Sequence, residues 1–401
     1  MSPSAAPRLA ERRGGVSLFV VAIFAAAFLI FLVQPMVGKR ILPWFGGVPA
    51  VWMLCLAFYQ TTLFLGYAYA HALDRFAPPR LHPWLHGLLV VGAFLSLPVL
   101  PSEIWRPEAA SDPSLRILAM LTANVALPFL VLASSGPLVQ LWFARRHPGR
   151  SPYPLYAVSN LGSLLALLAY PIAIEPLLGL SRLDPLWSSG FAVAALAVVG
   201  CAFLARDAGP RSAQADAGGG AQPQATPGRI ALWLGLPACA VVVLMAVTSK
   251  LCLDVASVPF LWILPLATYL LSFIVCFASE RAYRRGAWVA LSIVALAAVN
   301  LPGYLARWLE PADMMFAHSL AYQIASYCGL LLAVCMVLHG ELYRLRPAPH
   351  ALTGFYLCVS GGGAAGGLFV GLLAPLLFSD YFEFEIGLAL AAVLFFAALR
   401  A

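Results

Sequence analysis

Long apolar segments follow one another along almost the whole chain, and they constrain its fold more than any other feature. Their ranges are 16–37, 48–72, 84–101, 115–143, 154–179, 184–205, 229–249, 257–279, 286–306, 314–339, 351–379 and 384–400. A membrane-spanning helix needs about 20 apolar residues. An open chain in lipid must also satisfy its own backbone hydrogen bonds. The sequence therefore predicts an all-α polytopic membrane protein with about 12 transmembrane helices.

Composition excludes the other broad classes of protein. Hydrophobic residues make up 62% of the chain and charged residues 10%, whereas a soluble protein carries about 25% charged residues. The net charge of +7 comes from residues in short loops between the apolar segments. This placement favours contact with the membrane surface over nucleic-acid binding. The eight cysteines are scattered through apolar segments, which is typical of small buried side chains.

One polar segment divides the chain. Residues 206–228 contain no large apolar side chain, which is typical of a flexible linker. The predicted organisation is a six-helix half at 1–205, a cytoplasmic linker at 206–228 and a second six-helix half at 229–401. Because six spans are an even number, both halves enter the membrane from the same side.

The two halves are related in sequence. Segments 48–59 and 258–269, which start 210 positions apart, share seven of twelve residues, and a weaker match relates 159–163 to 360–364. Such self-similarity marks an internal repeat. A parallel repeat of six helices predicts the architecture of major-facilitator transporters.

The basic residues predict the orientation, because cytoplasmic loops carry an excess of arginine and lysine. With both termini in the cytoplasm, seventeen of the 24 basic residues lie inside. The seven outside are Lys39, Arg40, Arg106, Arg116, Arg182, Lys250 and Arg307. The predicted location is the bacterial inner membrane.

The chain has only two lysines, and they occupy matched places. Lys39 follows the first span and Lys250 follows the seventh, level with Arg40 after subtraction of the 210-residue offset. One interpretation is a cationic pair near the outer mouth of a pathway, contacting a solute or a partner carboxylate. The alternative is two interfacial anchors that reach the headgroups. Asp254 lies four residues after Lys250, on the same helix face if the helix continues.

Three further polar residues lie inside apolar segments. Glu175 stands between Pro171 and Pro176, so we expect a broken helix there, with the acid either facing a cavity or lying at the interface. Gln34 and Asn160 are candidate solute contacts, although hydrogen bonding between helices is the interpretation that we favour for both.

No motif indicates catalysis, a metal or a cofactor. The glycine-rich run 361–367 lacks the lysine of a phosphate-binding loop and predicts close helix packing instead. His82 and His86 are four residues apart, but no third ligand accompanies them. We therefore expect neither an enzyme nor a metal site.

Several strings resemble a known bacterial family. They are 31–39, 42–52, 156–163 and 253–262, and they are similar to the membrane part of the fused major-facilitator/spermidine-synthase-like proteins. The resemblance spans essentially the whole chain and implies the major-facilitator fold. Members of this family usually continue into a soluble synthase-like domain. The present sequence ends after its last apolar segment, so we expect no synthase activity.

Two functions remain open from the sequence. The first is alternating-access transport of a small polar or charged solute across the lipid bilayer, and the resemblance makes a polyamine-related metabolite one candidate. The second is a non-transporting membrane module that recruits a separately encoded soluble synthase-like partner through Arg145-Arg146 and Arg284-Arg285.

Overall fold

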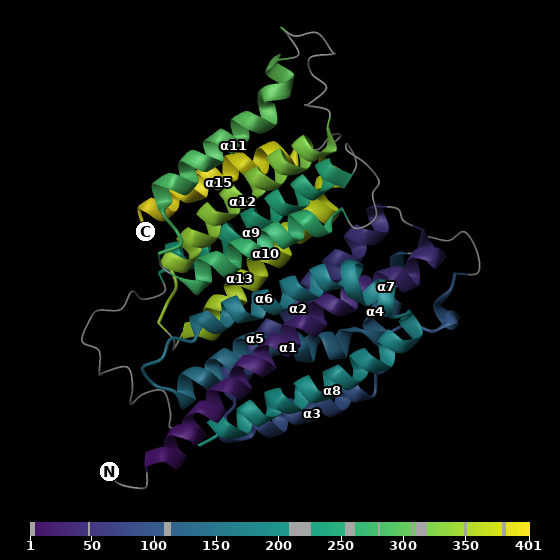
Figure 1. Ribbon diagram of the computed structural model, residues 1–401, viewed down its shortest axis with the longest axis vertical. Coiled ribbons are helices and arrows are strands. Elements are labelled where there is room, and N and C mark those ends of the chain that lie inside the picture. The colour runs from purple at the N-terminus through teal and green to yellow at the C-terminus, as the bar shows by residue number, and fades with distance from the viewer. Residues whose placement is uncertain are drawn as a thin grey trace. The chain divides into compact units, whose positions relative to one another are not determined.

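The computed structural model describes residues 5–46, 49–107, 114–207, 226–252, 261–279, 281–305, 308, 319–348, 351–378 and 382–401. Every regular element in these ranges is helical (Figure 1). The elements before the predicted linker are α1 (Ala5–Phe45), α2 (Pro49–Phe76), η1 (Pro79–Leu81), α3 (His82–Phe94), η2 (Glu103–Trp105), α4 (Ser114–Asn124), α5 (Ala126–Arg146), α6 (Tyr153–Ala169), η3 (Tyr170–Ile174), α7 (Glu175–Leu177) and α8 (Leu180–Ala205). Those after it are α9 (Pro227–Lys250), α10 (Ile263–Ala278), α11 (Arg285–Leu305), α12 (Leu320–Arg344), α13 (Leu352–Leu368), η7 (Phe369–Leu373), α14 (Ala374–Leu377) and α15 (Glu383–Leu399).

Each of the twelve predicted segments contains a helix, but two segments differ from expectation. The third holds only the 13 residues of α3, about 20 Å of helix. The fourth is divided between α4 and α5 at Val125. Pro128 explains the division, because its ring nitrogen cannot bond the carbonyl of Asn124.

The chain packs as two compact units. Unit 1 comprises Met1–Gln224 and Pro347–Ser360, and unit 2 comprises Ala225–Arg346 and Gly361–Ala401. The first half of α13 thus belongs to unit 1, although the sequence assigned all of 229–401 to the second half. Most of the predicted linker, residues 208–225, lies outside the described residues.

Unit 1 is organised around α1, which packs along α5, α6 and α8 (Figure 1). The closest approach is between α1 and α6. A Cβ atom at Gly162 would lie 2.6 Å from the carbonyl oxygen of Phe24, so only glycine allows this contact. Trp142 on α5 and Phe19 on α1 are among the fully buried side chains of the core.

Unit 2 repeats this crossing with its own helices. Its central helix α9 packs against α12, α15 and α10. A Cβ atom at Gly362 of α13 would collide with the carbonyl of Leu234 on α9, and one at Gly366 with the carbonyl of Ala238. The glycine-rich run therefore packs closely against a helix, as predicted. Phe24 and Leu234 are 210 residues apart, which is the offset of the sequence repeat.

Both units contain a π-helical turn. A π-helical turn follows α6 at η3, and another follows α13 at η7. Their starts are 199 residues apart, and each leads into a short helix that begins one residue before a Pro-Leu-Leu sequence, at 176–178 and 375–377. The matched turns support the internal repeat from backbone geometry alone.

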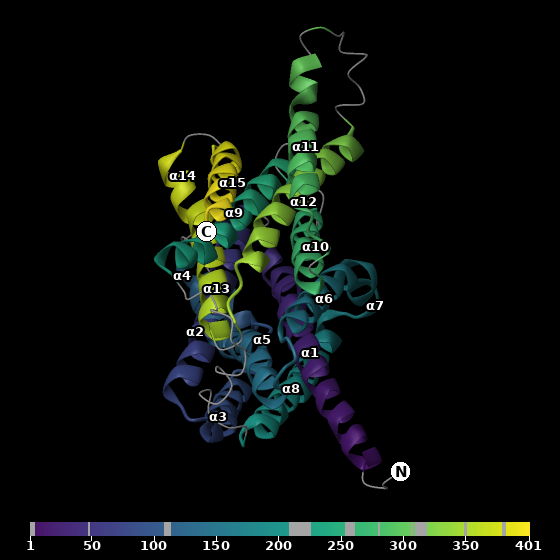
Figure 2. The same ribbon diagram turned by 90° about the vertical axis from the view of Figure 1, so that its left-hand side faces the viewer.

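Eight helices in the described ranges are long and apolar enough to cross a membrane. The α11 span has none of its residues buried. In Figure 1 this helix lies on the outer side of α15 and α12, and in Figure 2 its upper part projects beyond them. Such a helix is suited to contact with lipid on most sides. All eight cysteines are free thiols, and none is exposed.

Candidate functional site

Two residues that the sequence singled out separately form an ion pair. Lys39 lies near the end of α1, and Glu175 begins α7, 136 residues later. The lysine Nζ donates to the Glu175 Oε1 at 2.7 Å. The side chains are 40% and 25% exposed, so solvent screens the pair, and it contributes about 1 kcal/mol or less to stability. An accessible ammonium and carboxylate can each exchange its partner for a charged group of a solute.

Arg40, the residue after Lys39, contacts a different part of the chain. Arg40 donates from Nε to the carbonyl of Pro101 at 3.1 Å, and its guanidinium pairs with Glu103 at 3.1 Å. It also stacks over the ring of Trp44. Arg40 therefore ties α1 to the loop around η2, which leaves Lys39 as the cation that faces Glu175.

The backbone beside Glu175 was predicted to break, and that prediction is wrong. The chain instead continues from α6 through the π turn η3 into α7. A π turn absorbs the irregularity that Pro171 and Pro176 impose, while the backbone stays helical. Such turns frequently stand at functional sites.

Gln34 and Asn160 do not form the interhelical hydrogen bonds that we expected. Gln34 Nε2 donates to the carbonyl of Ile30 at 3.4 Å, and Asn160 Nδ2 donates to that of Tyr156 at 2.8 Å. Each amide finds an acceptor four residues back on its own helix. Both side chains are half-buried, so whether they contact a solute stays a prediction.

The predicted partnership in the second half remains untested. Lys250 is the last residue of α9 and is half-buried. Asp254 lies outside the described residues, as does the rest of 253–260.

A buried ion pair that was not predicted from the sequence joins α2 to α5. Arg145 donates to Asp74 Oδ1 at 2.6 Å, and the two side chains are 11% and 2% exposed. Removing either member of such a pair leaves an uncompensated charge inside the protein. This contact is therefore far more sensitive to substitution than the pair at Lys39.

The second oxygen of Asp74 extends the pair to α13. Thr353 donates its hydroxyl proton to Asp74 Oδ2 at 2.9 Å. The same hydroxyl lies 3.1 Å from Nδ1 of His71. A hydroxyl has one proton to give, so His71 must be the donor and carries its proton on Nδ1. A continuous network thus runs from His71 through Thr353 and Asp74 to Arg145, and we call it the α13 network.

Tyrosines surround the same part of α13. Tyr356 donates its hydroxyl to Gln140 Oε1 at 2.8 Å, and its ring stacks on Tyr156 with centroids 4.9 Å apart. Tyr153 donates to the carbonyl of Pro347. Both Tyr356 and Gln140 are almost completely buried. These polar bonds are enclosed by aromatic rings, which exclude water and strengthen them.

Three residues that were considered above for partner docking or metal binding form contacts within the chain. Arg145 pairs with Asp74, and Arg285 forms two bonds of 2.6 Å with Glu341. His82 accepts from the Trp142 indole at Nδ1 and lies 3.1 Å from the carbonyl of Ala77 at Nε2. Both of its ring nitrogens are thus engaged, and no group of three potential metal ligands occurs among the described residues.

Comparison with known proteins identifies the architecture. No protein-family model and no curated protein matches the sequence. Solved structures do match over nearly the whole chain. One is the major-facilitator proton:xylose symporter XylE bound to 6-bromo-6-deoxy-D-glucose, with a TM-score of 0.56, 13% identity and coverage of 97% of this chain and 96% of that chain.

The chain has the major-facilitator fold. A peptide transporter in complex with sulfate matches with a TM-score of 0.58 and 15% identity, covering 97% of this chain and 94% of that one. A bacterial homologue of the iron transporter ferroportin, in an outward-facing state, matches at 0.55 and 15%, covering 96% and 98%. The protein is a multi-pass membrane protein, and the three structures named here are those of a symporter, a peptide transporter and a homologue of an iron transporter. Nothing in these comparisons supports the spermidine-synthase-like family in particular.

Proposed function

We propose that the protein is a secondary transporter of the inner membrane that moves a small polar or charged solute by alternating access. The major-facilitator fold supports this proposal. The observation that carries it is the α13 network, a set of polar bonds that joins α13 to α2 and α2 to α5.

The course of α13 explains why this network matters. Residues up to Ser360 belong to unit 1, and residues from Gly361 onward belong to unit 2. The change falls at three consecutive glycines, Gly361 to Gly363, which lie inside the continuous helix α13. A movement of unit 2 would be carried along α13 to the bonds at Thr353. Alternating access requires contacts of this kind, stable in one state and released in another.

The Lys39–Glu175 pair supports a solute with charge. The ammonium of Lys39 can bind a carboxylate or phosphate of a solute in place of Glu175. The carboxylate of Glu175 can likewise bind an amine of a solute in place of Lys39. A polyamine-related metabolite would engage the carboxylate. An organic anion would engage the ammonium. A zwitterionic amino acid would engage both.

The recruitment of a soluble synthase-like partner has weaker support. Two of its four proposed contact residues, Arg145 and Arg285, are committed to ion pairs within the chain. Transport is therefore the function that we propose.

The test begins with a thermal-shift screen of polyamines, amino acids and organic anions on the purified protein. A solute at 100 times its dissociation constant stabilises the folded state by about 2.7 kcal/mol. Solutes that stabilise the protein are then followed into liposomes that contain it. Asp74→Asn should alter the transport rate strongly, whereas Asp207→Asn, at an exposed pair with Arg206, should leave it unchanged.

Two results would contradict the proposal. One is the absence of uptake for every stabilising solute. The other is an identical transport rate in wild type, Asp74→Asn and Asp207→Asn, which would separate the α13 network from the transport cycle.

A further inference from the structure

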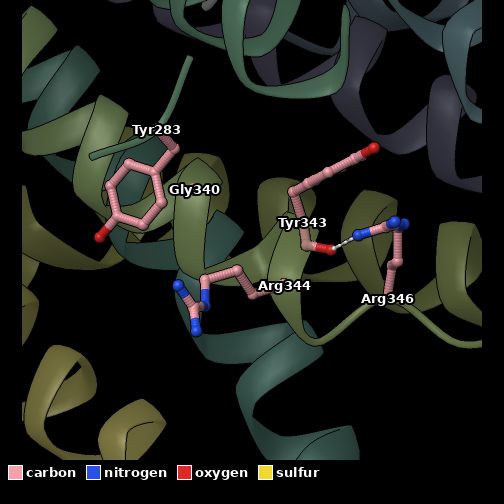
Figure 3. Close-up of a pocket in the computed structure, with 5 residues that line it drawn as sticks. All are labelled: Tyr283, Gly340, Tyr343, Arg344 and Arg346. Carbon is pink, nitrogen blue, oxygen red and sulfur yellow. Dashed lines mark hydrogen bonds between the residues drawn. The ribbon is translucent and has the colours of Figure 1, made fainter. Parts of the chain in front are cut away.

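Unit 2 contains a basic pocket that the proposed transport function does not use. Its volume is about 330 Å³, and Tyr283, Gly340, Tyr343, Arg344 and Arg346 line it. In the view of Figure 3, Tyr283 lies on one side of Gly340, Tyr343 and Arg346 lie on the other, and Arg344 stands between them. Two of the five lining residues are arginines and two are tyrosines, so the pocket combines positive charge with aromatic surface.

The charge around the pocket is strongly positive. Segments 281–285 and 340–346 carry five arginines and one acid, Glu341, which gives a formal charge of +4 (5 − 1). Glu341 is fully engaged, because Tyr283 and Arg285 donate three bonds of 2.6–2.7 Å to its two oxygens. Arg344 is exposed and forms no hydrogen bond or ion pair with any described residue. The pocket therefore keeps positive charge that this acid does not neutralise.

The remaining walls are held in place by packing. The Tyr283 ring lies so close to Gly340 that a Cβ atom there would collide with it. Burial raises the pKa of the Tyr283 phenol, so it stays protonated and continues to donate to Glu341. On the other side, the Arg346 guanidinium stacks 3.8 Å above the Tyr343 ring and donates to the Tyr343 carbonyl at 2.9 Å. Stacking holds that guanidinium in one orientation.

The pocket lies at the membrane surface. Arg344 is the last residue of one candidate span, and Arg285 is the first residue of another. The helices that carry them, α12 and α11, pack together. At this level phospholipid headgroups surround a membrane protein, and basic pockets between helices bind anionic headgroups.

We propose that this pocket binds a phosphate group, and that the group is carried by an anionic phospholipid. Arginine suits this ligand because its planar fork pairs with phosphate oxygens in a bidentate manner. Arg344 is the residue available for such a pairing, and Tyr343 and Tyr283 provide the apolar sides against which the glycerol portion packs.

The experiment is native mass spectrometry of the purified full chain, titrated with phosphatidylglycerol or with phosphatidylcholine. Phosphatidylcholine tests whether net negative charge is required, because its ammonium cancels the phosphate charge. Wild type should bind one phosphatidylglycerol more tightly than any phosphatidylcholine. Arg344→Gln should weaken that binding about tenfold, as expected for the loss of a hydrogen bond to a charged group.

The matched control is Arg146→Gln, because Arg146 is also an exposed arginine at the end of a spanning helix. It should bind phosphatidylglycerol as wild type does. Arg344→Lys, which keeps the charge but not the fork, should fall between wild type and Arg344→Gln.

A competition arm distinguishes the source of the phosphate. Inorganic phosphate at millimolar concentration should leave the lipid bound if the headgroup is the ligand. If inorganic phosphate displaces the lipid, the pocket is still a phosphate site, but its ligand is a free anion. Equal binding of the two lipids, or equal binding by Arg344→Gln and Arg146→Gln, would overturn the proposal.

Discussion

Replacing Asp74 by asparagine removes the negative charge of the buried ion pair but keeps the shape of the side chain. The substituted side chain keeps an oxygen that can accept from Thr353, but Arg145 loses its counter-charge. Because the two side chains are only 2% and 11% exposed, water cannot replace the lost carboxylate. Stranding a buried charge in this way costs about 3–5 kcal/mol. We therefore expect Asp74→Asn to lower the free energy of unfolding by about 3 kcal/mol or more.

The assay is reversible unfolding in mixed micelles, followed by tryptophan fluorescence, on a double-mutant cycle with Arg145→Gln. Residues in one network show coupling energies of about 0.5–3 kcal/mol, so the double variant should be more stable than the sum of the single losses predicts. Asp207→Asn is the control. Its pair with Arg206 is 73% and 46% exposed and should contribute about 0–1 kcal/mol. Equal losses for Asp74→Asn and Asp207→Asn, or strict additivity in the cycle, would refute the reasoning.

Three further predictions concern packing, the exposed pair and topology. Gly162→Ala should destabilise the fold by about 1–3 kcal/mol, as overpacking does, whereas Gly87→Ala, where a Cβ meets nothing within 4 Å, should be neutral or stabilising in the same unfolding assay. Lys39→Arg should leave the amount of protein in the membrane unchanged but reduce transport, because a planar fork does not replace a compact ammonium; unchanged transport would return Lys39 to the role of an interfacial anchor. Alkaline phosphatase fused after Pro227 should be inactive and fused after Arg106 active, and the reverse pattern would invert the predicted orientation.

Features set by hydrophobicity could be predicted from the sequence. Twelve apolar segments give twelve helical segments, because a backbone without water has few other ways to bond. The matched 48–59 and 258–269 strings indicated the repeat. Gly162 and Gly362 show the same repeat in packing, because a helix backbone approaches each of them closely. The glycine-rich run was interpreted correctly as a packing surface because it lies within an apolar segment.

Pairings between distant residues could not be predicted in the same way. Lys39 and Glu175 were each noted, but nothing local indicated that 136 intervening residues would bring them together. Asp74 was missed because its place at the end of a span resembles an ordinary loop charge. Gln140 carried a usable signal, since it is a polar residue inside an apolar span, whereas Thr353 carried none. The π turn was missed because proline predicts an interrupted helix and does not specify how the helix accommodates it.

The matched π turns bear on the ancestry of the molecule. A π turn closes its hydrogen bonds one residue further along than an α turn, so it houses an extra residue. Since η3 and η7 stand at equivalent places, that residue was already present in the ancestral half when the chain doubled. The counterparts of Lys39 and Glu175, at offsets of 210 and 199, are the uncharged Ser249 and Ala374. The two halves therefore share one scaffold, whereas the two positions that Lys39 and Glu175 occupy are charged in the first half alone.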